Sequence, residues 1–279
     1  MNVSTRKVSL RGLGSVRCFA SQSATKSHDL HKGQVGKVRL EHTKLPNGLP
    51  IIALENDSPI SRVAVVVRAG ARFEGVGQLG VTHALRNAAG LSTKMSTTFG
   101  ITRNMDYAAC SLTAAGTRDD LIYAVDALRD SIADPVAFLA DTVTRPLFKP
   151  WELDDNSFRL SIDLKRMKSA PDVRLIELLH KAAFSSGLSN SLFSPDFMIG
   201  KHDHNMVNTF VSEHFVTSRM AVVGLGVDLQ HLVNQVEKTF EFNNVAGPQL
   251  VKPKFIAGNL RKETGSSVTY AAVVAEGAS

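Results

Sequence analysis

The sequence predicts an α+β fold, a two-layer sandwich in which a mostly antiparallel sheet packs against helices. A Pro46-Asn47-Gly48 turn separates two short apolar segments, which predicts a β-hairpin. Residues 61–69 form a β-branched, apolar run typical of a buried strand. Segments with helical spacing follow in separate stretches, and this separation favours a sandwich over a doubly wound sheet.

The strands have the clearest boundaries. Those of the hairpin are expected at 39–43 and 49–54, and further strands at 107–114 and 220–224. Gly224-Leu225-Gly226 follows the last of these. It lacks the third glycine of a dinucleotide-binding turn, so it predicts a tight turn from strand to helix.

The helices are predicted from apolar spacing. A helix from about Arg118 is expected to bury one face, which comprises Leu121, Ile122, Val125, Leu128 and Ile132. A long polar helix is expected at 151–168, and another at 172–185 beyond Pro171. A further helix precedes the strand at 220, with an apolar face of Met206, Val207, Phe210 and Val211. Residues 38–247 are then one domain, large enough to bury a core.

The N-terminal segment, residues 1–37, has the composition of a mitochondrial transit peptide followed by a linker. The first 28 residues contain five Lys or Arg, no Asp or Glu and many Ser and Thr. Arg17-Cys18-Phe19-Ala20 matches a matrix cleavage pattern, which predicts a cut between Phe19 and Ala20. The alternative is a disordered basic tail that stays attached.

The charge balance excludes a strongly basic binding protein. The whole chain has 32 basic and 26 acidic residues, but without the five N-terminal cations 27 and 26 remain, a balance of +1. Nucleic-acid binding is therefore not expected. No run of about 18 apolar residues occurs, so any membrane association is expected through partners.

Isolated Cys and His residues have ordinary structural explanations. Cys110 would be the single cysteine of the processed chain, and it is expected to be a buried apolar residue rather than a nucleophile. Lys201-His202-Asp203-His204 could bind a metal at the surface, but a solvated loop in which Asp203 starts a helix is the simpler interpretation.

The most informative motif is His83-Ala84-Leu85-Arg86-Asn87. An inverted zinc motif reads His-x-x-Glu-His on one helix, with two histidine ligands and a glutamate base. Here the first ligand is His83, Arg86 occupies the base position and Asn87 the second ligand position. Because arginine cannot accept a proton, a hydrolytic site is not expected. By itself, the motif favours an ordinary core or surface histidine at position 83.

The surroundings of His83 make the motif more specific. A buried strand, then Gly70-x-Arg72-x-Glu74, then a helix with a leading glycine resembles the mitochondrial processing peptidase family, also called pitrilysin-like or inverzincin. The resemblance implies a third ligand, a glutamate, about seventy-five residues beyond the second histidine. Asp163 stands at that place and is one methylene shorter. The resemblance therefore implies a degenerate site (His83, Arg86, Asn87 and Asp163) with no catalytic residue, metal or cofactor.

Several further segments resemble members of this family that lack the active site. Ser92-Thr93-Lys94 and residues 99–103, 178–184, 194–201 and 214–226 are similar to the core proteins of ubiquinol–cytochrome c reductase (complex III), core protein 2 in particular. The resemblance implies a structural subunit on the matrix side of the mitochondrial inner membrane. Its implied partners are core protein 1 and the cytochrome and iron–sulfur subunits of a dimeric complex.

Two alternatives remain open. A non-catalytic α-type subunit of the processing peptidase would bind presequences instead. An active metallopeptidase would have to hold zinc with His83, Asn87 and Asp163, which is a poor ligand set.

Family subunits consist of two homologous halves, and the C-terminal residues are expected to begin the second. Residues 248–279 are predicted to be a linker and the start of a truncated second domain, with its first strand at 267–274. An unpaired apolar strand of this kind is an aggregation hazard. This pattern suggests a truncated product, a fragment or a shortened gene model.

Overall fold

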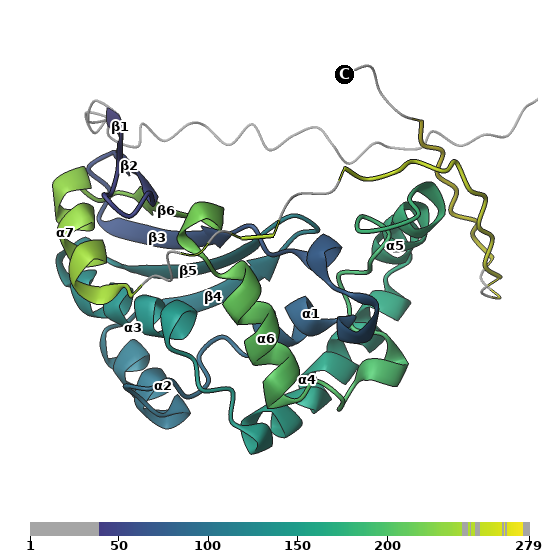
Figure 1. The fold of residues 1–279 in the computed structure, drawn as a ribbon, viewed down its shortest axis with the longest axis horizontal. Coiled ribbons are helices and arrows are strands. Elements are labelled where there is room, and N and C mark those ends of the chain that lie inside the picture. Colours follow the sequence, from purple (N-terminus) through teal and green to yellow (C-terminus); the bar gives the residue numbers. More distant parts are fainter. Residues whose placement is uncertain are drawn as a thin grey trace, which may run out of the picture. The chain divides into compact units, whose positions relative to one another are not determined.

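The computed structural model describes residues 39–241, 245, 247–248, 252–263, 265 and 267–275. The predicted transit peptide, with Arg17, Phe19 and Ala20 at its cleavage site, lies outside these residues. Within them a single sheet packs against a layer of helices, which Figure 1 shows beneath the sheet. The predicted α+β sandwich is confirmed.

The sheet has six strands in the order β1-β2-β6-β3-β5-β4. The strands are β1 Arg39–Lys44, β2 Pro50–Glu55, β3 Ile60–Val67, β4 Ser111–Gly116, β5 Leu121–Leu128 and β6 Met220–Leu225. All neighbours are antiparallel except β2 and β6, which are parallel. The predicted hairpin and the strands expected at 61–69 and 220–224 are confirmed, as is the mostly antiparallel sheet.

Seven α-helices are described. They are α1 Val81–Asn87, α2 Thr98–Tyr107, α3 Ala133–Thr144, α4 Pro150–Ser169, α5 Pro171–Ala183, α6 His204–His214 and α7 Leu229–Thr239. The helices predicted at 151–168 and 172–185 are confirmed as α4 and α5, which Pro171 separates. Asp203 starts α6 as expected, because its carboxylate accepts a hydrogen bond from the Met206 N–H (2.8 Å).

The core lies between the sheet and the helices. Along β3, Val63, Val65 and Val67 are fully buried and alternate with more exposed residues such as Arg62, so one face of the strand packs and the other is open to solvent. Leu139 of α3 and Phe210 of α6 are among the largest fully buried side chains. None of the described helices is long and apolar enough to cross a bilayer.

The helix predicted from Arg118 is wrong, because residues 121–128 form the strand β5. Its residues pair with β3, with Val125 opposite Val63 and Tyr123 opposite Val65. Leu121, Val125 and Ala127 are buried on one face of this strand, whereas the other face is partly exposed. Because that other face also carries the apolar residues Ile122 and Leu128, the apolar spacing along the sequence mimics a helical period.

Two further expectations need correction. The strand predicted at 107–114 begins only at Ser111, because Tyr107 ends α2. No strand is assigned at 267–274, since no neighbouring strand pairs with these residues in the part of the chain that the structure describes. Instead, the chain before it forms an isolated bridge between Phe255 and Phe184 at the end of α5.

Candidate functional site

Helix α1, which carries the degenerate motif, is held in place by Glu74. The buried Glu74 carboxylate accepts hydrogen bonds from the N–H groups of Gly80 (2.7 Å) and Thr82 (2.9 Å) and from the Thr82 hydroxyl (2.5 Å). Gly80 has φ +83°, and an added Cβ would lie 2.5 Å from Ser194. Burial raises the pKa of Glu74 to about 7 against the opposing effect of these hydrogen bonds. Glu74 thus caps the helix start and fixes where His83 lies.

His83 is almost completely enclosed, with 1 % of its surface exposed. Its Nδ1 accepts a hydrogen bond from the Ser194 N–H (3.1 Å), and its Nε2 lies 3.3 Å from Oδ2 of Asp163. Because Nδ1 accepts, the proton of the neutral ring must be on Nε2, which donates to Asp163. Burial lowers the pKa of His83 to about 4, and the nearby Arg86 charge adds to this effect. At neutral pH the contact with Asp163 is therefore a hydrogen bond rather than an ion pair.

The structure brings together three of the four motif positions. Asn87, one turn after His83, donates from Nδ2 to the His83 carbonyl (3.2 Å) and to Oδ2 of Asp163 (3.3 Å). Asp163 reaches both residues from α4, and its side chain keeps about a third of its surface exposed. The three ligand positions are therefore adjacent in space, but their side chains use their polar atoms in hydrogen bonds to one another.

Arg86, at the base position, faces a different part of the molecule. Its guanidinium donates to the Leu192 carbonyl and lies 5.8 Å from the centroid of the Phe193 ring. Glu177 of α5 accepts from the Leu192 N–H (3.2 Å), so both sides of this residue are fixed. Together with the bond from Ser194 to His83, these contacts attach the loop around Leu192 to α1 and α5. The motif therefore has a structural use.

The residues present do not fit a zinc ion. A zinc-bound neutral imidazole carries its proton on the nitrogen that does not bind the metal. In His83 that nitrogen, Nδ1, faces the Ser194 N–H donor, so binding through Nε2 would place two donors against each other. Asn87 offers an amide and Arg86 a cation. Among the residues that the structure describes, no group of three or more His, Cys, Asp or Glu side chains could hold a metal.

The His202 and His204 segment also has mainly structural contacts. His202 is buried and its Nε2 bonds to the Leu79 carbonyl (3.1 Å), while Nδ1 of His204 bonds to the Phe148 carbonyl (2.9 Å). Cys110 is half-buried rather than fully buried and packs on Met105, with Sγ 3.0 Å from Sδ. Burial raises the pKa of the Cys110 thiol, which disfavours the nucleophilic thiolate.

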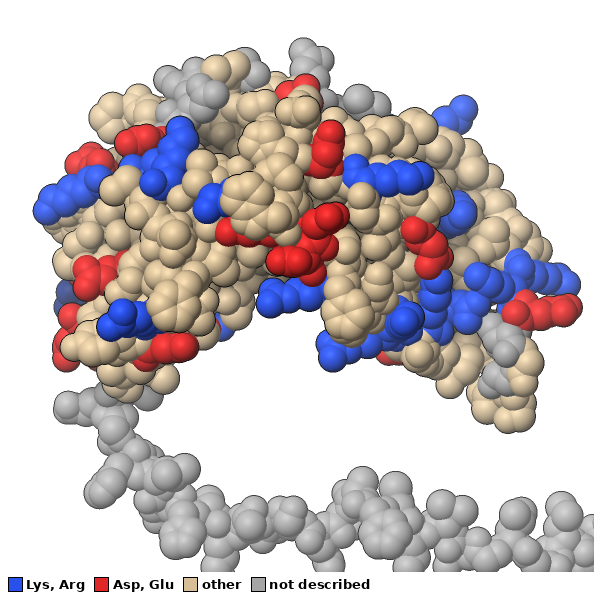
Figure 2. All heavy atoms as spheres, turned by 90° about the horizontal axis from the view of Figure 1, so that it is seen from below, with Lys and Arg blue, Asp and Glu red and all other residues tan. Residues whose placement is uncertain are grey.

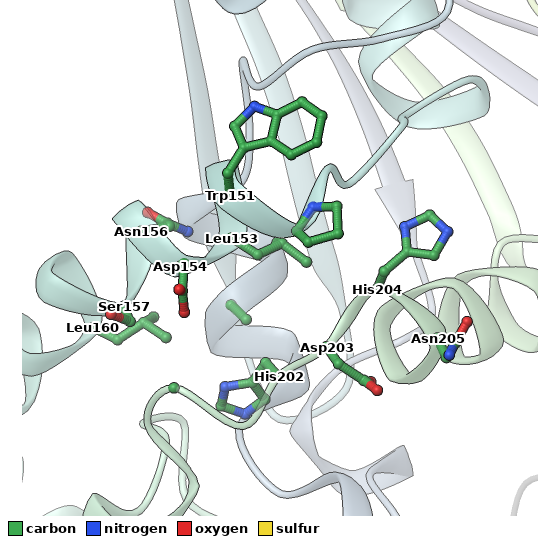
Figure 3. Close-up of a pocket in the computed structure, with 13 residues that line it drawn as sticks. Trp151, Leu153, Asp154, Asn156, Ser157, Leu160, His202, Asp203, His204 and Asn205 are labelled. Atoms are coloured by element: carbon green, nitrogen blue, oxygen red, sulfur yellow. The ribbon is translucent and has the colours of Figure 1, made fainter.

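Sequence inspection missed two features of this region. Ser194 sets the tautomer of His83 through its backbone N–H, and no sequence signal marks a backbone donor. A cavity of about 700 Å³ lies between the start of α4 and the segment before α6, and Figure 3 shows its lining residues, which include Trp151, Asp154, Asn156 and His202. Of these residues, only His202 belongs to a sequence pattern that indicates a possible site. Trp151, Asp154 and Asn156 lie on an ordinary polar helix.

Comparison of the sequence with known proteins places this chain in a family. Residues 51–196 match the sequence model of the family described as insulinase (peptidase family M16). The chain is 38 % identical over 239 residues to the mitochondrial cytochrome b-c1 complex subunit 2 of Rattus norvegicus and of Homo sapiens, covering 86 % of this chain and 53 % of each relative. It is 29 % identical over 240 residues to the probable mitochondrial-processing peptidase subunit alpha-1 of Arabidopsis thaliana, covering 85 % and 48 %.

These matches cover most of this chain but only part of each relative. The chain spans about half the length of the curated relatives it matches. The family match itself covers just over half of this chain and includes α1, the motif and all of α4. The chain therefore belongs to the insulinase family, peptidase family M16.

Proposed function

We propose that this chain is a non-catalytic structural subunit of mitochondrial ubiquinol–cytochrome c reductase, of the core protein 2 type. The observation that carries the proposal is the 38 % identity to cytochrome b-c1 complex subunit 2, against 29 % to the processing peptidase α subunit over a similar share of the chain. The site geometry supports it, because His83, Asn87 and Asp163 bond to one another and Arg86 replaces the base. A structural role needs none of these groups for chemistry.

The proposal includes the partners and the location of the protein. Its partners would be core protein 1 and the cytochrome and iron–sulfur subunits of the dimeric complex, on the matrix side of the inner membrane. Figure 2 shows acidic and basic side chains on the face seen from below, with Asp and Glu near its centre and a row of Lys and Arg toward its lower right.

Blue-native electrophoresis of detergent-solubilised mitochondria, with mass spectrometry of the bands, tests this proposal. Peptides of this chain should migrate with complex III. Detection of the chain only as a free monomer, in cells that contain intact complex III, would contradict the proposal. Core protein 1 in the same band serves as the internal control for recovery of the complex.

The division of the chain into three segments is a second part of the proposal. Residues 1–37 would be a transit peptide and linker, 38–247 the family domain, and 248–279 a linker and the start of a second domain. Import of the full chain into isolated mitochondria should give a product that begins at Ala20. The variant Arg17→Ala should slow this processing, whereas Lys26→Ala, beyond the cut, should not. A product that still begins at Met1 would contradict the transit peptide.

The similarity to the processing peptidase α subunit supports one alternative function. An α-type subunit would bind basic amphipathic presequence peptides and migrate with a soluble peptidase. The same electrophoresis experiment separates the two functions. Presence only in the soluble peptidase, with saturable presequence binding, would favour the alternative.

A further inference from the structure

Among the described residues, the cavity at the start of α4 is lined by polar and apolar groups that include carboxylates but no basic Lys or Arg side chain. It measures about 700 Å³, within the size range of ligand sites. Its described lining contains two carboxylates, two histidines, two asparagines and a serine but no Lys or Arg. The remaining surface is apolar or glycine and comprises Ala84, Pro150, Trp151, Leu153, Leu160 and Gly200.

Two enclosed side chains of this lining have unused hydrogen-bonding capacity. Asn156 is 4 % exposed, and neither its Oδ1 nor its Nδ2 has a hydrogen-bond partner among the described residues. His202 is 8 % exposed and donates from Nε2 to the Leu79 carbonyl, which leaves Nδ1 as an acceptor. That Nδ1 also has no partner within the described part of the chain. Burial lowers the pKa of His202, so the ring is neutral and this acceptor is retained.

The carboxylates add negative charge beside these acceptors. Figure 3 shows Asp154 extending from α4 toward the segment that carries His202. Asp203 lies on that segment, and its Oδ1 accepts from the Met206 N–H while Oδ2 is left over. Within the described residues, no Lys or Arg forms an ion pair with Asp154 or Asp203.

Trp151 lies at one end of the cavity, with its ring directed away from His202 (Figure 3). Trp151 is 63 % exposed. Nζ of Lys149 lies 5.6 Å from the centroid of its ring. A planar guanidinium pairs with carboxylates such as that of Asp154 through its forked N–H groups.

We propose that this cavity binds the guanidinium group of an arginine side chain presented by a partner polypeptide. Guanidinium has five N–H donors and no acceptor, and it is always charged. It therefore matches the unpaired acceptor on His202 together with the Asp154 charge, and Trp151, at the other end of the same cavity, reports its occupation. This site is separate from the structural role proposed above and does not depend on assembly into complex III.

Fluorescence of the purified full chain tests the proposal, because Trp151 is its single tryptophan. A short peptide with one arginine is titrated in, and quenching or a shift of the tryptophan emission reports binding at this cavity. The matched peptide with citrulline in place of arginine keeps the shape but loses the charge. The arginine peptide should saturate the signal, and the citrulline peptide should bind at least about tenfold more weakly.

Two variants on one helix turn locate the site. Asp154→Asn should weaken arginine-peptide binding about tenfold, whereas the neighbouring Asp155→Asn, which does not line the cavity, should change it less than about twofold. Both residues are exposed, so both variants should fold, which circular dichroism checks. Free arginine should bind more weakly than the peptide.

Three results would overturn the binding of a guanidinium group in this cavity. The first is no change in emission with the arginine peptide, and the second is equal binding of the citrulline peptide. The third is equal weakening by both variants. Equal binding of free arginine and the peptide would overturn the assignment to a polypeptide.

Discussion

Two polar sites share helix α4 and differ in how their hydrogen-bonding groups are used. In the second half of the helix, Asp163 bonds to His83 and Asn87, and the backbone of Ser194 completes the set. In the first half, Asn156 keeps unpaired polar atoms beside a cavity, as does His202 from the segment before α6. The first site stabilises the fold and has little capacity left for a ligand. The second has that capacity but pays a desolvation penalty.

The largest expected effect is at the paired site. Glu74→Ala removes the acceptor for three hydrogen bonds at the start of α1, and the Gly80 and Thr82 donors are left without it. The free energy of unfolding should fall by about 4 kcal/mol, since each unsatisfied buried donor costs about 1–3 kcal/mol. Urea denaturation measures it. Glu237→Ala, on the exposed side of α7, is the control, and a loss below about 1 kcal/mol for Glu74→Ala would contradict the capping role.

A pH series gives the next largest effect. The pKa of His83 falls from 6.5 to about 4 on folding, so its contribution to stability is full above pH 6.5 and is lost as the pH drops through 4. Relative to His83→Gln, the wild type should lose about 3 kcal/mol over this interval.

Comparing the two proteins isolates His83 from other groups that titrate. His214, whose pKa is also lowered to about 4, changes stability in the same direction, and Glu74, with a pKa of about 7, in the opposite one. Arg86, Asp163 and His202 are the charged or titratable neighbours of His83. Parallel stability curves for wild type and His83→Gln would show that His83 is not held neutral.

At the cavity, a substitution should have the opposite effect on stability. Asn156→Leu replaces an unpaired buried amide by an apolar side chain of similar size, so stability should stay unchanged or rise by up to about 1 kcal/mol. Asn208→Leu is the matched control. It removes an amide that bonds to His204 (2.8 Å) and should cost about 1 kcal/mol. A loss above about 2 kcal/mol for Asn156→Leu would mean that its amide is satisfied in solution.

The smallest expected effect is that of zinc. Protein purified without chelator should contain far less than one zinc per chain by mass spectrometry of the metal, and added zinc should not raise its melting temperature, because the free nitrogen of His83 faces a donor. Stoichiometric zinc that a chelator removes, with loss of stability, would contradict the paired description of this site.

The fold was predictable wherever local patterns agree with the tertiary environment. The hairpin around Asn47-Gly48, the strand containing Val63 and Val65 and the helices on either side of Pro171 follow from turn chemistry, alternation and the missing proline N–H. Residues 121–128 were mispredicted because the partly exposed face of the strand also carries apolar residues, Ile122 and Leu128, which mimic a helical period. Helices α2 and α3 were not predicted at all.

The sequence by itself determined the residue types at the degenerate motif and the absence of a base, since Arg86 cannot accept a proton in any conformation. It also located Asp163, through the spacing that the family resemblance implies. Only the tertiary structure decided that His83 is neutral with its proton on Nε2, because that depends on the Ser194 backbone, 111 residues away. The cavity likewise needed the structure, since packing α4 against the segment before α6 brings together residues that carry no joint signal along the chain.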